Sequence, residues 1–455
     1  MNKMSKFAHV FDLGEHVALW HSLRMKPVFL SHEAYDKLLQ GKCDKKLELE
    51  LLDKKIFLSY EHEDEEVLQR FRTNSPKPDI NLAYFILSER CNLACKYCFV
   101  GSDTCGKGIS SVKDMSFDVA EKAIDVFARQ LEHSDCDYTK NESNIIFFGG
   151  EPLLKFDVLE YIARRVREIS KSRPALRNTN MAVITNGTLL NEDKILALDD
   201  VGVAVSISID GFTKEANSMR VDNAGVGTFE RVLHVLEIYK SLNVEPPSLS
   251  VTLTEKTIED LPNMVELVRN FNIRGFGYNV LLKRDNEQDD VNYYEAASDF
   301  IINSFLALRE HGVYEDRIMR KLNAFANSKI HYSDCGATSG GQMMFVPDGR
   351  IGICQGLMAE DENYVADIWD DEFIASEHDA WKSWGSLIPI HNDNCLSCEA
   401  LGICGGGCPV NAKLASSECN MNCIDERSCI HSKRTLRFLI EDLYRLVLEN
   451  SAEDI

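Results

Sequence analysis

The sequence lacks the features that mark secreted, membrane-spanning and nucleic-acid-binding proteins. No stretch approaches the roughly 18 consecutive apolar residues that a membrane-spanning helix needs. The first residues contain neither an apolar core segment nor a small-residue cleavage site, so we expect no secretory signal peptide and a cytoplasmic protein. Basic residues are few, with 50 Lys and Arg against 72 Asp and Glu, a formal charge of −22. We therefore expect no membrane and no nucleic acid as partners, because a phosphate backbone is bound by clustered cations.

Internal repeats and low-complexity tracts are absent as well, which leaves an ordinary globular protein. The 455 residues are 44% hydrophobic and 27% charged, and this length corresponds to about three domains. Two acidic runs, Glu61–Glu66 and Asp285–Asp290, are interpreted as solvated surface. The residue type present in unusual number is cysteine, with 15 residues.

The cysteines do not have the pattern of a disulfide framework. Their number is odd, and in a reducing compartment clustered cysteines more often bind metal. Three share the window Cys91–Cys98, and nine more lie between Cys335 and Cys429. Zinc is the simplest partner of grouped cysteines, but a zinc site unites two close pairs, and the first window has only three cysteines. Three thiolates suit a [4Fe–4S] cluster that keeps one iron open for a substrate or cofactor.

The N-terminal residues 1–78 have the composition of a small separate module. Short β-rich runs are expected at residues 9–13, 17–22 and 27–30. Helices are expected at residues 32–40, 47–58 and 64–71, the first of them capped by Ser31. Three short strands followed by three helices suit a winged-helix-like module, which the Pro-containing segment Thr73–Pro78 closes as a linker.

Residues 79–328 alternate between short apolar runs and amphipathic stretches. Strands are expected at residues 82–88, 145–148, 182–185, 203–209, 248–253 and 277–281. Helices are expected at residues 117–131, 157–170, 229–242 and 261–271. About six βα repeats predict an α/β fold with a parallel sheet, either doubly wound or, as we prefer, a partial (β/α)6 TIM-type barrel. Functional residues should follow the strand C-termini, and the cysteine window follows the first strand.

The last part of the chain, residues 329–455, has no such alternation. Cysteines, glycines and short segments predominate there. We expect a loop-rich domain that relies on metal centres, because it has little apolar surface of its own. An amphipathic helix is expected from Lys433 to Glu449.

The spacing of Cys91, Cys95 and Cys98, with the aromatic residues Tyr97 and Phe99 around the last cysteine, resembles the signature of radical SAM enzymes. In that family the three cysteines hold a [4Fe–4S] cluster whose open iron binds S-adenosylmethionine (SAM). One electron breaks the sulfonium C–S bond, and the resulting 5′-deoxyadenosyl radical removes a hydrogen atom from the substrate. The resemblance implies an oxidoreductase supplied with electrons by a donor such as flavodoxin or ferredoxin.

Motifs after the next three expected strands resemble the family's SAM-binding segments. Gly149-Gly150-Glu151-Pro152 is similar to the motif that receives the methionine ammonium, and Thr185-Asn186-Gly187 is similar to a turn beside the cofactor. Ser208 and Arg220 match the hydroxyl and guanidinium that hold the methionine carboxylate, a group that a planar guanidinium pairs with through two hydrogen bonds. The resemblance implies SAM contacts from Tyr97, Gly149, Gly150, Glu151, Asn186, Ser208 and Arg220.

The C-terminal third resembles the SPASM extension, which holds two auxiliary [4Fe–4S] clusters. The match consists of Cys335, of Gly349 with Cys354 five residues later, and of the closely spaced Cys395, Cys398, Cys404 and Cys408. The resemblance implies three [4Fe–4S] clusters in all, with the first auxiliary cluster on Cys335, Cys354 and Cys408. The second would take Cys395, Cys398, Cys404 and a late cysteine, for which we choose Cys429 because it leads into the terminal helix.

The first auxiliary set is one ligand short, so its fourth iron is open to a substrate thiolate or takes an unexpected ligand. Cys423 and Cys419 are the alternatives to Cys429 in the second set. Cys105 also remains unassigned, and we interpret Cys43 and Cys136 as buried or incidental thiols.

SPASM proteins mostly modify peptides, and residues 1–78 resemble the domain that binds the leader of ribosomally made precursor peptides. An extended leader would add a strand to the sheet of this module. The expected function is a peptide maturase that forms an intramolecular crosslink, either a thioether or a carbon–carbon bond. Sulfatase maturation is an alternative, but those enzymes place an Asp where this chain has Gln355. We also consider a peptide epimerase and, from a different class of protein, a non-enzymatic, metal-stabilised peptide-binding scaffold.

Overall fold

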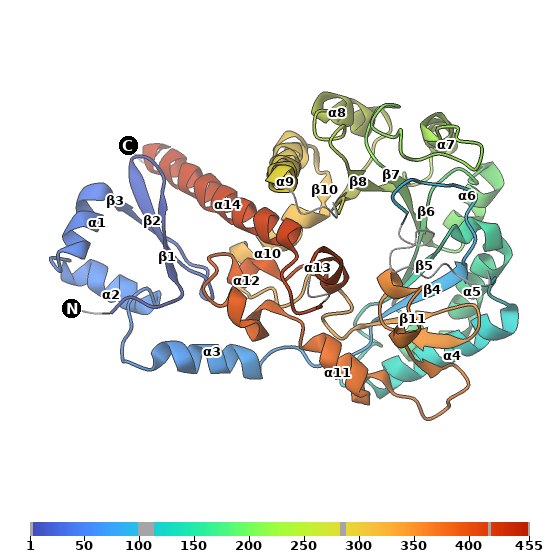
Figure 1. Cartoon of the computed structure of the whole chain (residues 1–455), viewed down its shortest axis with the longest axis horizontal. Coiled ribbons are helices and arrows are strands. Elements are labelled where there is room, and N and C mark those ends of the chain that lie inside the picture. The colour runs from blue at the N-terminus through green and yellow to red at the C-terminus, as the bar shows by residue number, and fades with distance from the viewer. Residues whose placement is uncertain (1–2, 99–112, 283–287, 417–419, 454–455) are drawn as a thin grey trace.

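The computed structural model describes residues 3–98, 113–282, 288–416 and 420–453. A small three-stranded sheet lies near the N-terminus, and the rest of the chain is built around a ten-stranded sheet. Figure 1 places the two sheets at opposite ends of the molecule, with short helices of the C-terminal third and the long terminal helix between them. In the described part of the chain, no helix combines the length and the apolar character needed to span a bilayer. The acidic run Asp285–Asp290 lies partly outside the described residues.

The small sheet is antiparallel and has the order β1-β2-β3, with β1 Ala8–Asp12, β2 His16–His21 and β3 Val28–Ser31. The helices that follow are α1 His32–Leu39, α2 Lys45–Asp53 and α3 Glu63–Thr73. These six elements confirm the expected order of three strands and three helices. Ser31 caps α1 as expected, because its side chain accepts a hydrogen bond from the Ala34 N–H. Buried side chains of β2, β3, α1 and α2 form one apolar core.

The acidic run Glu61–Glu66 is not simply solvated surface, because Glu63 and Asp64 are buried. The Asp64 carboxylate accepts hydrogen bonds from Ser5 Oγ at 2.6 Å and from the Lys6 N–H at 2.8 Å. A buried carboxylate is stable only when it is hydrogen-bonded or paired. The interpretation as solvated surface was therefore wrong for the side chains of Glu63 and Asp64. Through its two hydrogen bonds, Asp64 holds α3 against Ser5 and Lys6.

His21 makes the N-terminal module sensitive to acid. Its buried imidazole accepts hydrogen bonds at Nδ1 from the backbone N–H groups of Leu23 and Arg24, both at 3.2 Å. Burial and the charge of Arg24 lower the pKa of His21 to about 3. The unfolded chain has an ordinary His pKa of about 6.5, so the folded state binds the proton less tightly. Stability is therefore lost as the pH falls below about 6.5, by about 2 kcal/mol at pH 5.

Thermal melts of the wild type and of His21→Asn, at neutral pH and at about pH 5, measure this loss. The Asn side-chain oxygen occupies the position of Nδ1 and accepts the same two hydrogen bonds, but it does not titrate. We expect acid to lower the melting temperature of the wild type more than that of the variant. Equal acid sensitivity in the two proteins would contradict the role of His21.

The large sheet contains six parallel strands that follow one another in chain order: β4 Leu82–Ser88, β5 Ser143–Gly149, β6 Thr179–Thr185, β7 Val203–Ile209, β8 Ser248–Leu253 and β9 Gly275–Val280. A doubly wound sheet reverses its strand order at one point, and this sheet does not. The α/β class with a mainly parallel sheet is confirmed, and the unbroken order is consistent with a partial barrel.

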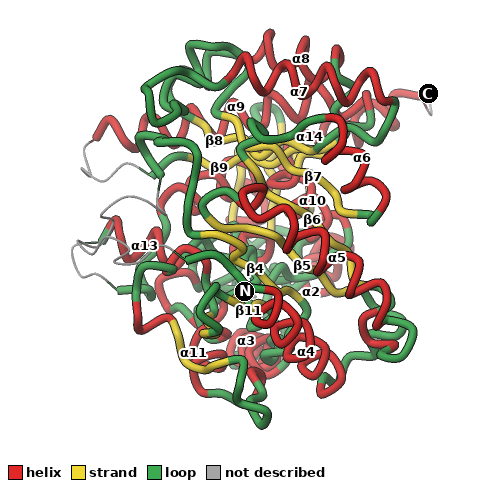
Figure 2. The backbone as a smooth tube through the Cα atoms, turned by 90° about the vertical axis from the view of Figure 1, so that its right-hand side faces the viewer, coloured by secondary structure: helices red, strands yellow, loops and turns green. Residues whose placement is uncertain are grey.

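Helices connect these strands and cover one face of the sheet: α4 Phe117–His133, α5 Phe156–Ile169, α6 Glu192–Asp200, α7 Phe229–Leu242 and α8 Leu261–Asn270. In Figure 2, α5 and α6 lie in front of the strands, and α7 and α8 lie above them. Along β5 to β8, buried residues alternate with residues that are partly exposed. A small barrel usually fills its interior with its own side chains. The face turned away from the helices, here named the inner face, is instead left accessible.

The C-terminal third continues this sheet. β11 Gln342–Phe345 pairs in parallel with β4, and β12 Arg350–Gly352 and β13 Tyr364–Asp367 add two antiparallel strands. β10 Tyr314–Glu315 pairs with β9 at the other edge. Strand pairing therefore joins part of residues 329–455 to the predicted barrel.

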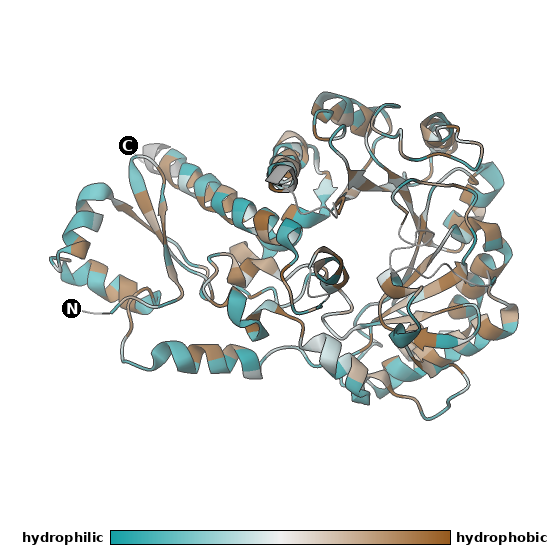
Figure 3. Ribbon diagram, viewed as in Figure 1, coloured by the Kyte–Doolittle hydropathy of each residue, from teal (hydrophilic) through white to brown (hydrophobic). Residues whose placement is uncertain are grey.

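The remaining helices are α9 Gln288–Leu308, α10 Asp316–Ala326, α11 Asp379–Gly385, α12 Leu401–Cys404, α13 Pro409–Ala415 and α14 Glu426–Glu453. The terminal helix α14 thus begins before the expected Lys433. Figure 3 shows apolar and polar residues alternating along it. Its buried residues Leu436, Leu439 and Ile440 pack with Trp20 of β2 and Ile403 of α12.

Candidate active site and cluster-binding cysteines

The cysteine window lies on the loop after β4, at the edge of the sheet where the parallel strands end. Backbone hydrogen bonds fix this loop to the segment that follows β7. The Ala94 N–H donates to the Val221 carbonyl at 2.8 Å. The Lys96 N–H donates to the Met219 carbonyl at 3.1 Å. Arg220 lies between these two anchors, so the loop holds its cysteines beside Arg220.

The three thiols of the window lie within electrostatic reach of one another. Burial, with smaller contributions from the charges of Cys98 and Cys95, raises the pKa of Cys91 to about 11. Burial also raises the pKa of Cys95, and the charge of Cys98 adds to this rise. An iron centre binds thiolates and releases their protons. Cys91, Cys95 and Cys98 therefore form a donor set that fits a cluster with one open iron.

Gly149 and Gly150 press the chain against the end of β4. The Gly150 N–H donates to the Ser88 carbonyl, and the Glu151 N–H donates to the Arg90 carbonyl, both at 2.8 Å. A Cβ at Gly150 would lie 2.3 Å from the Arg90 carbonyl oxygen. Gly149 has a φ of +139°, which other residues rarely adopt. The two glycines thereby bring Glu151 next to the cysteine window.

Glu151 is fully buried and connects this motif with the next one. Its carboxylate accepts hydrogen bonds from Thr185 Oγ1 at 2.7 Å and from the Asn186 N–H at 2.9 Å. Burial raises the pKa of Glu151, and these two hydrogen bonds oppose the rise. Asn186 Nδ2 in turn donates to Asn92 Oδ1 at 2.9 Å and lies 3.9 Å from Cys91 Sγ. Glu151 thus orients Asn186 against the cysteine window.

Tyr97, Asp210 and Arg220 form a second buried group beside the window. Arg220 donates to the Tyr97 hydroxyl at 2.8 Å, and its Nη1 lies 3.4 Å from Asp210 Oδ1. The Tyr97 hydroxyl donates to the same oxygen of Asp210. Burial raises the pKa of Asp210 to about 6, although Arg220 and Tyr97 lower it. At neutral pH the side chain is therefore a carboxylate paired with Arg220.

The other oxygen of Asp210, Oδ2, is buried and has no hydrogen-bond partner among the described residues. A buried acceptor without a donor is costly, and SAM carries an ammonium group and ribose hydroxyls that can donate. The residues present therefore fit this cofactor. The sequence analysis assigned Asp210 no contact with SAM, although this residue directly follows a parallel strand, where functional residues are expected. Ser208, two residues earlier on β7, lies on the same inner face and is partly exposed.

A second group of thiols lies where β11 joins the sheet beside β4. Cys335 precedes β11, Cys354 follows β12, and Cys408 is the N-cap of α13. Burial, followed by the charges of Cys408 and Cys335, raises the pKa of Cys354. Burial and then the charges of Cys335 and Cys354 raise the pKa of Tyr84, a residue of β4. The three thiols therefore form one group near the first strand of the barrel.

Asp425 adjoins this group but is already engaged. The Cys408 N–H donates to Asp425 Oδ2 at 3.0 Å. Arg427 donates to both Asp425 oxygens, each at 3.0 Å. Asp425 is thus a hydrogen-bonding partner that orients Cys408, and this set keeps three assigned ligands.

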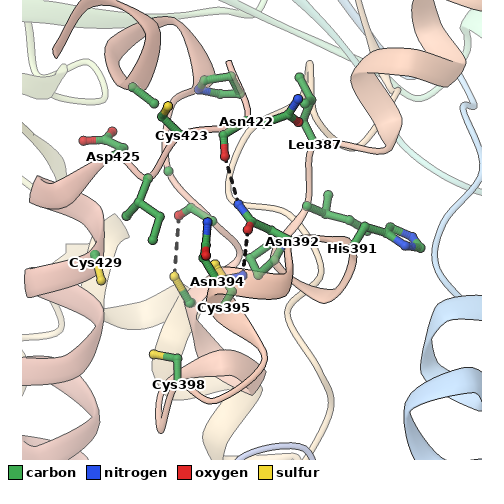
Figure 4. A pocket seen from close by; sticks show the side chains of 18 of the residues that line it. Leu387, His391, Asn392, Asn394, Cys395, Cys398, Asn422, Cys423, Asp425 and Cys429 are labelled. Atoms are coloured by element: carbon green, nitrogen blue, oxygen red, sulfur yellow. Dashed lines mark hydrogen bonds between the residues drawn. The ribbon is translucent and has the colours of Figure 1, made fainter. Parts of the chain in front are cut away.

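The third group of thiols lines a cavity of about 440 Å³ in the C-terminal third (Figure 4). Cys395 and Cys404 come from short helical segments, Cys398 lies in the turn between them, and Cys429 comes from the start of α14. Burial, with contributions from the charges of Cys404 and Cys429, raises the pKa of Cys398 to about 12. Figure 4 shows the sulfur atoms of Cys398 and Cys429 directed into the same space. All four predicted ligands therefore border one cavity.

The remaining cysteines have other surroundings. Cys423 lines the same cavity, but its Sγ donates to Ser416 Oγ at 3.2 Å, and Figure 4 shows it apart from Cys395, Cys398 and Cys429. Cys43 packs on the core of the N-terminal module, and Cys136 packs on the core of the large sheet. Phe99, Cys105 and Cys419 lie outside the described residues.

A single metal ion would need a tighter arrangement than these groups have. Across residues 3–98, 113–282, 288–416 and 420–453, no three His, Cys, Asp or Glu side chains are placed to hold one ion together. This observation concerns mononuclear sites, and a four-iron cluster takes its ligands on separate iron atoms.

Known proteins are similar to this chain in sequence and in fold. The Radical SAM superfamily model matches residues 85–268. Radical SAM cyclopropyl synthase TigE of Paramaledivibacter caminithermalis is 28% identical over 411 residues, which cover 86% of this chain and 81% of that protein. The cysteine-type anaerobic sulfatase-maturating enzyme of Clostridium perfringens is 26% identical over 351 residues, which cover 73% of this chain and 89% of that protein.

One similar solved structure is native anSMEcpe with bound AdoMet and Kp18Cys peptide. Its TM-score is 0.62 at 20% identity, over 82% of this chain and 99% of that chain. At this identity the similarity is one of fold. The segment matched by the family model begins in β4 and ends in α8, so it contains the cysteine window, Glu151, Asn186 and Arg220.

Proposed function

We propose that this radical SAM enzyme, whose family domain spans residues 85–268, matures a ribosomally made precursor peptide by forming an intramolecular crosslink. The relatives that match most of the chain are named as enzymes, so the non-enzymatic scaffold is set aside. The proposal rests on one observation. The three window thiols, the Glu151–Asn186 pair and Arg220 lie together at the edge of the sheet where the parallel strands end. These groups come from four different strand ends, and that is how parallel barrels build active sites.

The window and its neighbours supply a complete set of contacts for SAM. A [4Fe–4S] cluster bound to Cys91, Cys95 and Cys98 supplies the electron that cleaves SAM. The guanidinium of Arg220, with Ser208 and Tyr97 nearby, pairs with the methionine carboxylate. Gly149, Gly150 and Glu151 accept hydrogen bonds from the ammonium group through backbone and carboxylate oxygens. Asn186 and the unpartnered oxygen of Asp210 complete the polar contacts.

Two auxiliary [4Fe–4S] clusters belong to the proposal. One is held by Cys335, Cys354 and Cys408, beside Tyr84 on the inner face of the barrel. The other is held by Cys395, Cys398, Cys404 and Cys429 around the cavity of Figure 4. Such thiolate clusters stay loaded in a reducing compartment such as the cytoplasm, where flavodoxin or ferredoxin is available as electron donor.

The peptide substrate is supported by the accessible inner face and by the docking of the N-terminal module. Trp20 of β2 donates through Nε1 to the Glu399 carbonyl at 2.9 Å and stacks on Phe325, with 5.3 Å between ring centres. The winged-helix-like module thereby contacts α10 and the turn that follows Cys398. A leader that adds a strand to its sheet would tether the rest of the precursor near the barrel and raise its local concentration.

A carbon–carbon bond is the crosslink that we favour. The relative that matches 86% of the chain is named a cyclopropyl synthase, and closing a cyclopropane ring forms a carbon–carbon bond. A thioether is the other form of crosslink within the proposal. Either crosslink removes two hydrogens from the peptide. The first passes as an atom to the 5′-deoxyadenosyl radical, and the second leaves as a proton while its electron passes to an auxiliary cluster.

Sulfatase maturation is the second candidate, favoured by the 26% identity to the cysteine-type anaerobic sulfatase-maturating enzyme of Clostridium perfringens. Gln355 stands where the sulfatase maturases have a basic Asp. Its side-chain oxygen accepts a hydrogen bond from Gln342 Nε2 at 2.8 Å. A carboxamide cannot take up the proton that a carboxylate takes up, so this side chain does not supply the base of that reaction.

Co-expression of the protein with each short reading frame that adjoins its gene, followed by mass spectrometry, tests the function. A product that has lost two hydrogens, with 5′-deoxyadenosine formed alongside, is the expected result. A product whose mass is unchanged in ordinary water, but which gains one deuterium when the reaction is run in heavy water, would identify an epimerase. Oxidation of a sulfatase peptide by the purified enzyme, without change in any neighbouring peptide, would overturn the proposal.

A further inference from the structure

Lys321 is a cation buried in the interior of the protein. Its residue is 2% exposed, and it is among the largest fully buried side chains of the described chain. Nζ donates to the Cys404 carbonyl at 3.2 Å. Among the described residues, Lys321 has no carboxylate within ion-pair distance. A buried ammonium group with a neutral acceptor is costly unless a negative charge is nearby.

The carboxylate that faces this lysine is shared with other cations. Asp334 lies 2.9 Å from Arg320 and 3.3 Å from Arg317, and it also contacts His331 at 3.1 Å. Burial raises the pKa of Asp334, but the charges of Lys321 and its neighbours hold it well below the ordinary range. Asp334 therefore faces three basic side chains of helix α10, of which Arg320 has a second partner in Asp316 at 2.6 Å.

This cationic cluster lies between the two auxiliary sets of cysteines. Lys321 contacts the carbonyl of Cys404, which belongs to the second set, and Asp334 directly precedes Cys335, which belongs to the first. The Asp334 N–H donates to the Gly405 carbonyl at 2.7 Å, so the two segments are joined. Negative charge enters this region when iron binds thiolates.

We propose that Lys321 is the buried counter-charge of the auxiliary clusters and raises the reduction potential of the cluster on Cys395, Cys398, Cys404 and Cys429. The inference rests on the cluster assignment made under the proposed function. A cluster held by four thiolates is anionic and gains a further negative charge on reduction. A fixed positive charge in a poorly screened interior therefore stabilises the reduced form more than the oxidised form.

The test measures the reduction potentials of Lys321→Gln and Lys321→Met by electron paramagnetic resonance during redox titration. Both substitutions are made in a chain whose Cys91, Cys95 and Cys98 are alanine, so that only auxiliary signals remain. Gln keeps a donor for the Cys404 carbonyl, whereas Met removes both the donor and the charge. We expect both variants to shift the potential of one auxiliary cluster to more negative values. Lys329→Gln, which removes the charge of an exposed lysine three residues beyond α10, should leave both potentials unchanged.

Each other outcome has a defined meaning. A shift with Met but none with Gln would show that the hydrogen bond matters and would overturn the role of the charge, as would no shift with either. If the neutral variants fail to retain auxiliary iron, Lys321→Arg decides: retained iron supports the charge, and lost iron overturns it. Absence of auxiliary iron from the parent chain would overturn the cluster assignment itself, and iron analysis reveals this before any titration.

Discussion

Replacement of Cys95 by alanine is expected to reduce SAM cleavage by about 10³-fold or more, to the background of the assay. The thiol lies with those of Cys91 and Cys98 on a loop anchored beside Arg220, and two thiolates hold a cluster with an open iron poorly. The auxiliary cysteines come from other segments, so their clusters should stay loaded. Formation of 5′-deoxyadenosine under anaerobic, reducing conditions measures the loss, and iron analysis should show about one third of the iron missing.

Cys136→Ala is the matched control for this substitution. Cys136 is a half-buried cysteine that packs on the core of the large sheet, distant in sequence from the three thiol groups. This variant should keep its full iron content and its cleavage activity. Undiminished cleavage by Cys95→Ala would overturn the assignment of the window. Loss of all iron would show instead that the cysteine window and the auxiliary groups do not load independently.

Local patterns account for most of what the sequence could predict. The six parallel strands were found because apolar runs with β-rich composition end at recognisable turns, and the cap at Ser31 was found because capping depends on neighbouring residues only. The short helix α6 was not predicted, because it is mostly polar and only Asn191 marks its start. Strand β11 was not predicted either, for a different reason. Its pairing with β4 joins residues far apart in the chain, and no local pattern records such a partner.

The residues of the candidate site also fall into two groups, those that local patterns predicted and those that only the fold reveals. Cysteine spacing and the Gly149–Glu151 motif are short-range signals, and they led to groups that the fold brings together. Asp210 was given no role and Lys321 was missed, because what these side chains do depends on burial and on distant partners. In a helix that also carries Arg317 and Arg320, Lys321 is expected to be exposed to solvent, and only the packing of α10 against α12 and α14 buries it. Polar side chains buried by tertiary contacts are therefore the part of such a site that sequence patterns do not disclose.

Substitution of Arg220 by lysine is expected to weaken SAM binding by about 10- to 100-fold. Arg220 is buried, donates to the Tyr97 hydroxyl at 2.8 Å and lies 3.4 Å from Asp210 Oδ1. These partners aim the flat guanidinium, which can form two parallel hydrogen bonds with the methionine carboxylate, whereas an ammonium is a point charge and cannot reproduce that geometry. Calorimetric titration of SAM into the anaerobic, cluster-loaded protein measures the change.

Arg231→Lys provides the matched control for Arg220→Lys, because Arg231 pairs with Asp222 at 2.8 Å on the exposed surface of the same region. Exposed pairs of this kind contribute little, so the control should bind SAM as the wild type does. Iron content must be equal in all three proteins, since a change in loading would lower SAM binding indirectly. With equal iron, unchanged affinity in Arg220→Lys would show that the carboxylate of SAM is held elsewhere. A loss confined to Arg220→Lys would instead assign the buried group of Tyr97, Asp210 and Arg220 to the methionine end of the cofactor.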